Sequence, residues 1–255
     1  PRAKLRSLRA MRLAVTGLLA LALVLAAAGS ATAVPVKAAT AVVAGAFDND
    51  GVADLLVLAD AGQSLHKGAA NGTFRDITTE AMPAKVVARA GAFADADHDG
   101  DLDVIAGARL LRNNGNGRFT DVTAASFAKI ALDSPMAIVP TDFDNRRDVD
   151  FLFVNGQAPP ALLKNQRDGT FRDVAADAGL PRFAAYTSVT TADVNKDLAP
   201  DFFFARPNTA GVFAMSGPGG RFTLVDAPTD TANASATLFI DYDNDGLPDL
   251  FAWTP

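Results

Sequence analysis

The 255-residue sequence predicts an all-β protein, a β-propeller made of four-stranded blades of about 49 residues each. The first observation is that an acidic loop and a Phe-bearing segment both recur along the chain at that one interval. The second is composition, because 28 of the 29 acidic residues are Asp, which forms helices poorly, and only Glu80 is Glu. The third is that no helical periodicity is sustained beyond the N-terminal segment.

Residues 1–33 have the order of a secretory signal peptide. A basic head leads into an uncharged stretch, residues 13–28, and then into Ala31-Thr32-Ala33, which resembles a cleavage site. The apolar stretch of 16 residues is shorter than the ~20 that a membrane-spanning helix needs. We therefore expect a secreted protein, extracellular or periplasmic, with no stable membrane insertion after cleavage and a propeller domain over residues 34–255.

Charge and cysteine content exclude several classes of function. Residues 34–255 carry 18 basic and 29 acidic side chains, a net charge of −11, which argues against nucleic acid as a partner. The chain contains no cysteine, so it has no disulfide framework, no zinc–thiolate site and no thiol nucleophile.

The repeat is defined by five acidic loops whose starts are 49, 47, 51 and 48 residues apart. They are AFDNDGVAD (46–54), DADHDGDLD (95–103), DFDNRRDVD (142–150), DVNKDLAPD (193–201) and DYDNDGLPD (241–249). A second marker keeps the same period: NGTFRDIT (71–78), NGRFTDVT (116–123), DGTFRDVA (168–175) and GGRFTLVD (219–226). Two markers on one period identify a structural repeat.

Each repeat contains four strand-like segments separated by turns. An apolar run precedes each acidic loop, a second run such as DLLVLA follows it, a third short run leads to a Gly turn, and the Phe-bearing segment is the fourth. Residues 38–226 then make four blades, and residues 234–254 supply two strands of a fifth, so we expect an incomplete propeller and a fragment of a longer ring. We predict that Phe residues of the fourth segments pack between blades: Phe74, Phe119, Phe171 and Phe222.

The acidic loops predict calcium sites. In a D-x-D-x-D-G-x-x-D loop, carboxylates at positions 1, 3 and 5 converge, Gly at position 6 permits the turn, the carbonyl of position 7 faces inward, and Asp at position 9 closes the cage. Oxygen ligands in this number suit Ca²⁺. An EF-hand is rejected, since position 12 is Val57, Ala106 or Ala252 and the flanks are strand-like. The alternative is that these loops are only polar turns. That could explain one such loop, but it explains a series repeated on one period less well.

The loops differ in completeness. The second and fifth have every ligand, the first has Ala46 at position 1 and is expected to bind more weakly, and the fourth has Leu198 in place of the Gly. The third has Arg146 and Arg147 at positions 5 and 6, and we expect a guanidinium there to neutralise Asp142, Asp144 and Asp150 without a metal. The predicted metal ligands are Asp95, Asp97, Asp99, Asp101 and Asp103; Asp241, Asp243, Asp245, Leu247 and Asp249; Asp48, Asp50, Val52 and Asp54; and Asp193, Asn195, Asp197 and Asp201.

The loops, each followed by an apolar strand, together with the segment NNGNGRFTDVT (113–123), resemble the FG-GAP/VCBS repeats of integrin-α-like propellers. The segments FRDVAADAGL (171–180) and FTDVTAA (119–125) look most like the secreted ASPIC/UnbV, cartilage-acidic-protein-like branch. The resemblance covers residues 38–255 and implies a calcium-stabilised propeller that binds a partner. The sequence departs from the family in having no literal FG or GAP motif and no C-terminal ASPIC/UnbV domain.

No catalytic constellation is evident. The sequence contains two histidines, and neither a G-x-S-x-G elbow, a P-loop nor an H-E-x-x-H motif. We expect a non-catalytic, calcium-binding scaffold that presents loops to an extracellular protein or glycan. The alternative is a propeller enzyme, of lyase or glycosidase type, acting on an extracellular polymer from a site in the central channel, because such sites are dispersed in sequence.

Overall fold

The structure, a computed structural model, describes residue 34 and residues 38–254, so the predicted signal peptide lies outside the described residues. The described chain forms four antiparallel sheets of four strands and one sheet of two. The strands are β1 Ala39–Gly45, β2 Asp54–Ala59, β3 Ser64–Gly68 and β4 Phe74–Asp76; β5 Gly91–Ala94, β6 Asp103–Ala106, β7 Arg109–Asn113 and β8 Phe119–Asp121; β9 Pro135–Thr141, β10 Asp150–Asn155, β11 Ala161–Asn165 and β12 Phe171–Asp173; β13 Ser188–Ala192, β14 Asp201–Arg206, β15 Thr209–Gly217 and β16 Arg221–Asp226; and β17 Ala236–Ile240 and β18 Asp249–Trp253. The all-β prediction is confirmed.

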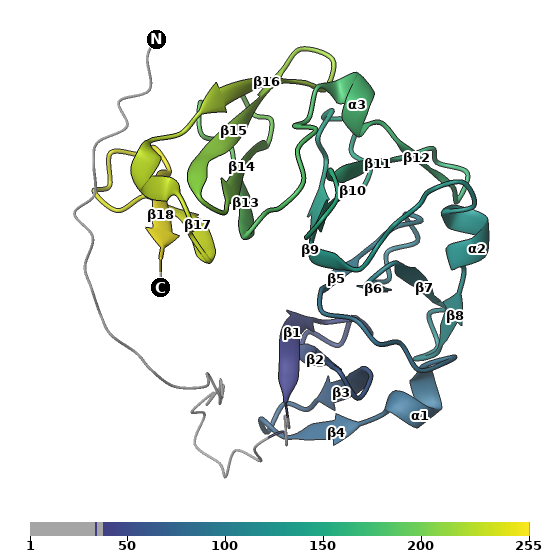
Figure 1. Ribbon diagram of the computed structural model, residues 1–255. Coiled ribbons are helices and arrows are strands. Elements are labelled where there is room, and N and C mark those ends of the chain that lie inside the picture. Colours follow the sequence, from purple (N-terminus) through teal and green to yellow (C-terminus); the bar gives the residue numbers. More distant parts are fainter. Residues whose placement is uncertain (1–33, 35–37, 255) are drawn as a thin grey trace.

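The sheets are blades arranged around an open arc (Figure 1). Within each four-stranded blade the strands are paired in chain order, and the first strand lies on the inner side of the arc while the fourth lies at the rim (Figure 1). The inner strands of neighbouring blades contact one another, as β1 does β5 and β13 does β17. This is a partial β-propeller of four blades with half of a fifth, as predicted.

The hydrophobic core lies between the blades. Second strands are buried along their whole length because both faces of each sheet are covered, as in β2, β6 and β10. Phe119, Phe171 and Phe222 are buried between their own blade and the preceding one, which confirms their predicted packing. Phe74 is only half-buried, since the described residues supply no blade before the first.

One-turn helices follow the fourth strands and were not expected from the sequence: α1 Thr78–Ala81, α2 Thr123–Ser126 and α3 Ala175–Ala178, with a 3₁₀ turn at Thr229–Thr231. Each α-helical turn starts two residues after an Asp whose Oδ1 accepts the backbone N–H of its first residue: Thr78 donates to Asp76 at 2.9 Å, Thr123 to Asp121 at 3.0 Å, and Ala175 to Asp173 at 2.9 Å. The signal was therefore present in the D-[IV]-[TA] motif, because Asp bonds its own backbone two residues on.

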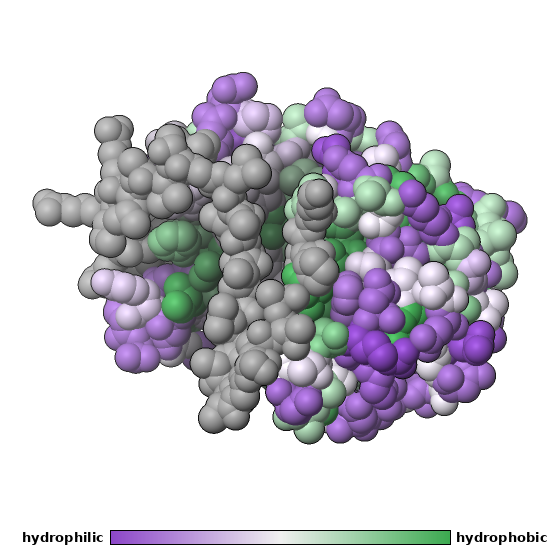
Figure 2. All heavy atoms as spheres, turned by 90° about the horizontal axis from the view of Figure 1, so that it is seen from below, coloured by the Kyte–Doolittle hydropathy of each residue, from purple (hydrophilic) through white to green (hydrophobic). Residues whose placement is uncertain are grey.

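The surface viewed from below carries hydrophobic residues toward its middle and mainly hydrophilic residues over its outer part (Figure 2). Among the described residues, no helix has both the length and the apolar character to cross a membrane.

Candidate metal-binding loops

The five acidic loops lie on one face of the arc. Each connects the first strand of a blade to the second, as between β1 and β2 or between β5 and β6. Because every blade is built in the same order, these connections all emerge at the same end of the strands. The propeller therefore gathers charge that is spread over about 200 residues of sequence.

The loops share one backbone conformation whether or not they contain the expected Gly. Position 6 has a left-handed φ of 77°, 92° and 83° at Gly51, Gly100 and Gly246, and of 65° and 70° at Arg147 and Leu198. A residue with a Cβ is disfavoured there by about 1–2 kcal/mol. The third and fourth loops thus keep the turn and bear that strain.

Position 4 was missed by the sequence reasoning. All five residues there have φ between 55° and 64°: Asn49, His98, Asn145, Lys196 and Asn244. The available signal was Asn at three of the five positions, because Asn tolerates this region better than most residues.

In the second, third and fourth loops the Asp at position 1 closes the turn by accepting backbone N–H groups from positions 5 and 6. In the second loop Asp95 accepts from Asp99 and Gly100, both at 3.1 Å. In the third, Asp142 accepts from Arg146 and Arg147, both at 2.8 Å. The curl that brings the carboxylates together is thus built by local hydrogen bonds.

Three loops bring carboxylates close enough to share an ion. One oxygen from each member of a group lies within 4.8 Å of the others, and the groups are Asp95, Asp97 and Asp99; Asp142, Asp144 and Asp150; and Asp241, Asp243 and Asp245. Two oxygens bound to Ca²⁺ at 2.3–2.6 Å are separated by no more than about 5 Å. These groups therefore fit a hard divalent cation, and the predicted ligands at positions 1, 3 and 5 of the second and fifth loops do converge.

The Asp at position 9 has a different environment from the one predicted. In the second loop Asp103 is 1% exposed, and its two oxygens accept N–H groups from Asn113 at 2.7 Å and Ala96 at 2.9 Å. Burial raises the pKa of Asp103 to about 7, against the opposing effect of these two hydrogen bonds. Asp54 and Asp201 accept two equivalent backbone bonds in the first and fourth blades. Position 9 thus ties its loop to the third strand and stands outside the converging group in the second and fifth loops.

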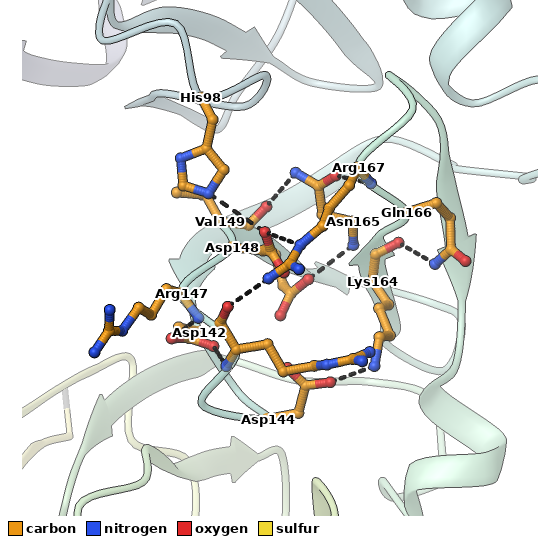
Figure 3. A network of polar contacts seen from close by, with 12 residues as sticks. His98, Asp142, Asp144, Arg147, Asp148, Val149, Lys164, Asn165, Gln166 and Arg167 are labelled. Atoms are coloured by element: carbon orange, nitrogen blue, oxygen red, sulfur yellow. Dashed lines mark hydrogen bonds and ion pairs between the residues drawn. The ribbon is translucent and has the colours of Figure 1, made fainter.

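The third loop corrects the prediction about its arginines. Arg146 and Arg147 contact Asp142 through their backbone N–H groups, and the positive charge on the loop comes instead from Lys164 and Arg167, both distant in sequence. Lys164 Nζ bonds Asp144, and Arg167 Nε lies 2.8 Å from Asp148 (Figure 3). The Arg167 guanidinium lowers the pKa of Asp148.

Asp150 in the same loop is 1% exposed, and burial raises its pKa to about 7. Its Oδ1 accepts the Asn165 N–H at 2.8 Å, whereas its Oδ2 is buried without a hydrogen-bond partner. The third loop, expected from the sequence to hold no metal, therefore joins three carboxylates as closely as the second and fifth do.

The first and fourth loops form no comparable group among the described residues. In the first, Lys67 bonds Asp48 and lies 3.2 Å from Asp50; the Val52 N–H donates to Asp50 at 2.8 Å, a bond that the second and fifth loops also have. In the fourth, Asn195 donates to Asp197 at 2.9 Å, and the Ser216 hydroxyl lies 2.8 Å from Asp201. Internal partners thus take up oxygens that a metal would otherwise use.

Adjacent loops also touch across the blade boundaries. Asn49 donates to the Gly100 carbonyl at 3.1 Å and to Asp101 at 2.9 Å. His98 Nε2 lies 3.3 Å from Asp148 in the third loop (Figure 3). Residues at position 4 therefore link the first loop to the second and the second to the third.

Acidic loops that recur between the first and second strands of successive blades define a β-propeller built from sequence repeats. The FG-GAP-like repeat model matches residues 47–106, 142–204 and 195–252, and the chain belongs to this family. These matches give no support to the narrower ASPIC/UnbV branch. No curated protein matches the chain significantly.

Solved structures resemble the fold at low identity. An Agrocybe aegerita lectin that recognises non-reducing terminal N-acetylglucosamine has a TM-score of 0.53 and 17% identity, over 82% of this chain and 59% of the lectin. The V. cholerae biofilm matrix protein Bap1 has a TM-score of 0.50 and 16% identity, over 84% of this chain and 34% of that protein. The chain therefore spans about three fifths and one third of these proteins, and the likeness concerns the fold.

Proposed function

We propose that this chain is a secreted, non-catalytic, calcium-binding propeller scaffold that binds an extracellular protein or glycan. The observation that carries the calcium part is the convergence of three carboxylates in the second loop and three in the fifth, on one face of the arc. Secretion rests on the sequence of residues 1–33. Glycan or protein binding is supported by the folds of a lectin and a biofilm matrix protein.

Calcium would be held by Asp95, Asp97 and Asp99 in the second loop and by the equivalent three residues of the fifth. Bound there, the ion would supply the positive charge that these exposed carboxylates lack. Its role would be structural, because it would hold a loop in one shape and lower the repulsion among neighbouring carboxylates.

Calcium titration of the full chain tests this proposal. At a hundredfold excess over Kd each site adds about 2.7 kcal/mol to the free energy of unfolding, so the melting temperature should rise by several degrees between chelator and Ca²⁺. Asp97→Asn should remove one calcium, and Asp60→Asn, which alters an exposed Asp paired with Arg89 outside the loops, should remove none. An equal calcium count in all three proteins, or no uptake at all, would overturn the calcium assignment.

The binding part needs its own experiment. The full chain would be tested against arrays of glycans, including terminal N-acetylglucosamine, and against extracellular matrix proteins, with and without Ca²⁺. Retention that calcium strengthens supports the scaffold. Turnover of a polymer, abolished by substituting acidic residues that face the channel, would favour the enzyme alternative instead.

A further inference from the structure

One position on the third strand of each blade carries a basic side chain in three blades and a neutral one in the fourth. The residue after it donates its backbone N–H to the Asp at position 9, which fixes the equivalence of the blades: Gly68, Asn113, Asn165 and Ser216. The residues at the position itself are Lys67, Arg112, Lys164 and Met215.

The two lysines reach into the acidic loops of their own blades. Lys67 Nζ contacts both Asp48 and Asp50 in the first loop. Lys164 Nζ bonds Asp144 in the third loop and lies 5.9 Å from the centroid of the Phe143 ring. The Lys164 and Asp144 side chains are 23% and 8% exposed, so this pair is largely withdrawn from water. In Figure 3 the ammonium lies against the loop.

The second blade differs although its residue is also basic. Arg112 donates to Asn114 at 3.4 Å, and no ion pair joins it to a carboxylate of the second loop among the described residues. In the fourth blade Met215 carries no charge. The loops therefore fall into two groups, the first and third with a lysine on their carboxylates and the others without.

We propose that Lys67 and Lys164 are tethered counter-cations that hold the first and third loops in place of a metal and so determine which loops respond to calcium. An ammonium on the adjacent strand is already at the loop, so it binds without the entropy loss of an ion from solution. Ca²⁺ entering the same cage meets the repulsion of that ammonium. The inference deepens the proposed function and rests on calcium binding at the second and fifth loops.

A second observation supports the inference in the third loop, where a buried carboxylate oxygen lacks a partner. Asp150 belongs to its carboxylate group, is almost wholly buried, and keeps one oxygen, Oδ2, without a hydrogen-bond partner. Removing the lysine therefore leaves a cage with converging carboxylates and a free acceptor oxygen. We expect Lys164→Met to convert the third loop into a calcium site.

The test compares Lys164→Met and Lys129→Met with the wild-type full chain. Met is the residue that the fourth blade has at this position, and Lys129 is an exposed lysine outside the loops. Lys164→Met should bind one more Ca²⁺ than wild type in isothermal titration. Its rise in melting temperature from chelator to calcium should exceed that of wild type by about 5 °C. The Lys129→Met control should match wild type.

The outcomes separate this inference from the proposed function. Lys164→Gln, which also removes the charge from the third loop, provides the same test if Lys164→Met does not fold. A calcium response in the lysine variants no greater than that of wild type would overturn the tethered-cation inference. Absence of calcium uptake by wild type would instead refute the proposed function, and a gain of calcium by Lys164→Met would still support the role of the lysine.

Discussion

Asn113 offers the sharpest test of how the blades are joined. It lies on β7 in the second blade, is 2% exposed, and donates through Nδ2 to the Phe47 carbonyl of the first loop at 2.8 Å and to the Leu102 carbonyl at 3.2 Å. Its Oδ1 accepts the Gly115 N–H at 3.1 Å. One amide side chain therefore bonds two loops and two blades.

We predict that Asn113→Ala lowers the free energy of unfolding by about 2–4 kcal/mol. A buried polar group that loses its partner costs about 1–3 kcal/mol, and this change strips two carbonyls at the blade boundary as well as one N–H. Asn114→Ala is the matched control, since the Asn114 side chain is exposed and hydrogen-bonds only to Arg112 and Thr120 in the same blade. Its cost should stay below about 0.5 kcal/mol.

Urea denaturation at constant calcium measures both variants, with the free energy taken by linear extrapolation and the slope m expected to be unchanged. Asn165→Ala, which removes the equivalent bonds to Ala96 and Val149, should behave like Asn113→Ala. A loss below about 0.5 kcal/mol for Asn113→Ala, equal to that of the control, would show that the asparagine bridge contributes nothing to blade packing.

Three further predictions concern the core and its titration. Burial lowers the pKa of His66, so the stability that this residue contributes should grow as the pH rises to about 6.5, whereas Asp103 and Asp150, whose pKa values are raised to about 7, act in the opposite direction; the difference in free energy of unfolding between wild type and His66→Gln should therefore grow with pH in melts across pH 5–8. Gly68→Ala should destabilise strongly because a Cβ there lies 2.2 Å from the Ala53 carbonyl oxygen, whereas Gly156→Ala, with open space, should be tolerated in the same denaturation assay. Phe153→Ala should cost about 3–5 kcal/mol, since Phe153 is fully buried between the second and third blades; a loss under 1 kcal/mol in urea would contradict that packing.

The sequence was enough to predict the repeat and the convergence of carboxylates in the second and fifth loops, because both depend on interactions between residues close together in the chain. Nine consecutive residues determine where Asp95, Asp97 and Asp99 lie relative to one another, and the hydrogen bonds that curl the loop run between neighbours. The effect of Arg147 and Leu198 at the turn was less predictable, because the surrounding loop holds them in a conformation that their side chains disfavour.

The 49-residue period, the four strands of each blade and the acidic loops were all determined by the sequence itself, since they depend on alternation, turn residues and spacing within short segments. The lysines that contact the first and third loops were placed there by tertiary structure. Lys164 reaches Asp144 across 20 residues because strand register sets it there, and Asn113 reaches Phe47 across 66 because blades pack face to face. Hydrogen bonds and ion pairs between residues that far apart depend on how strands are paired within a blade and how blades pack on one another. A short segment of sequence does not encode either.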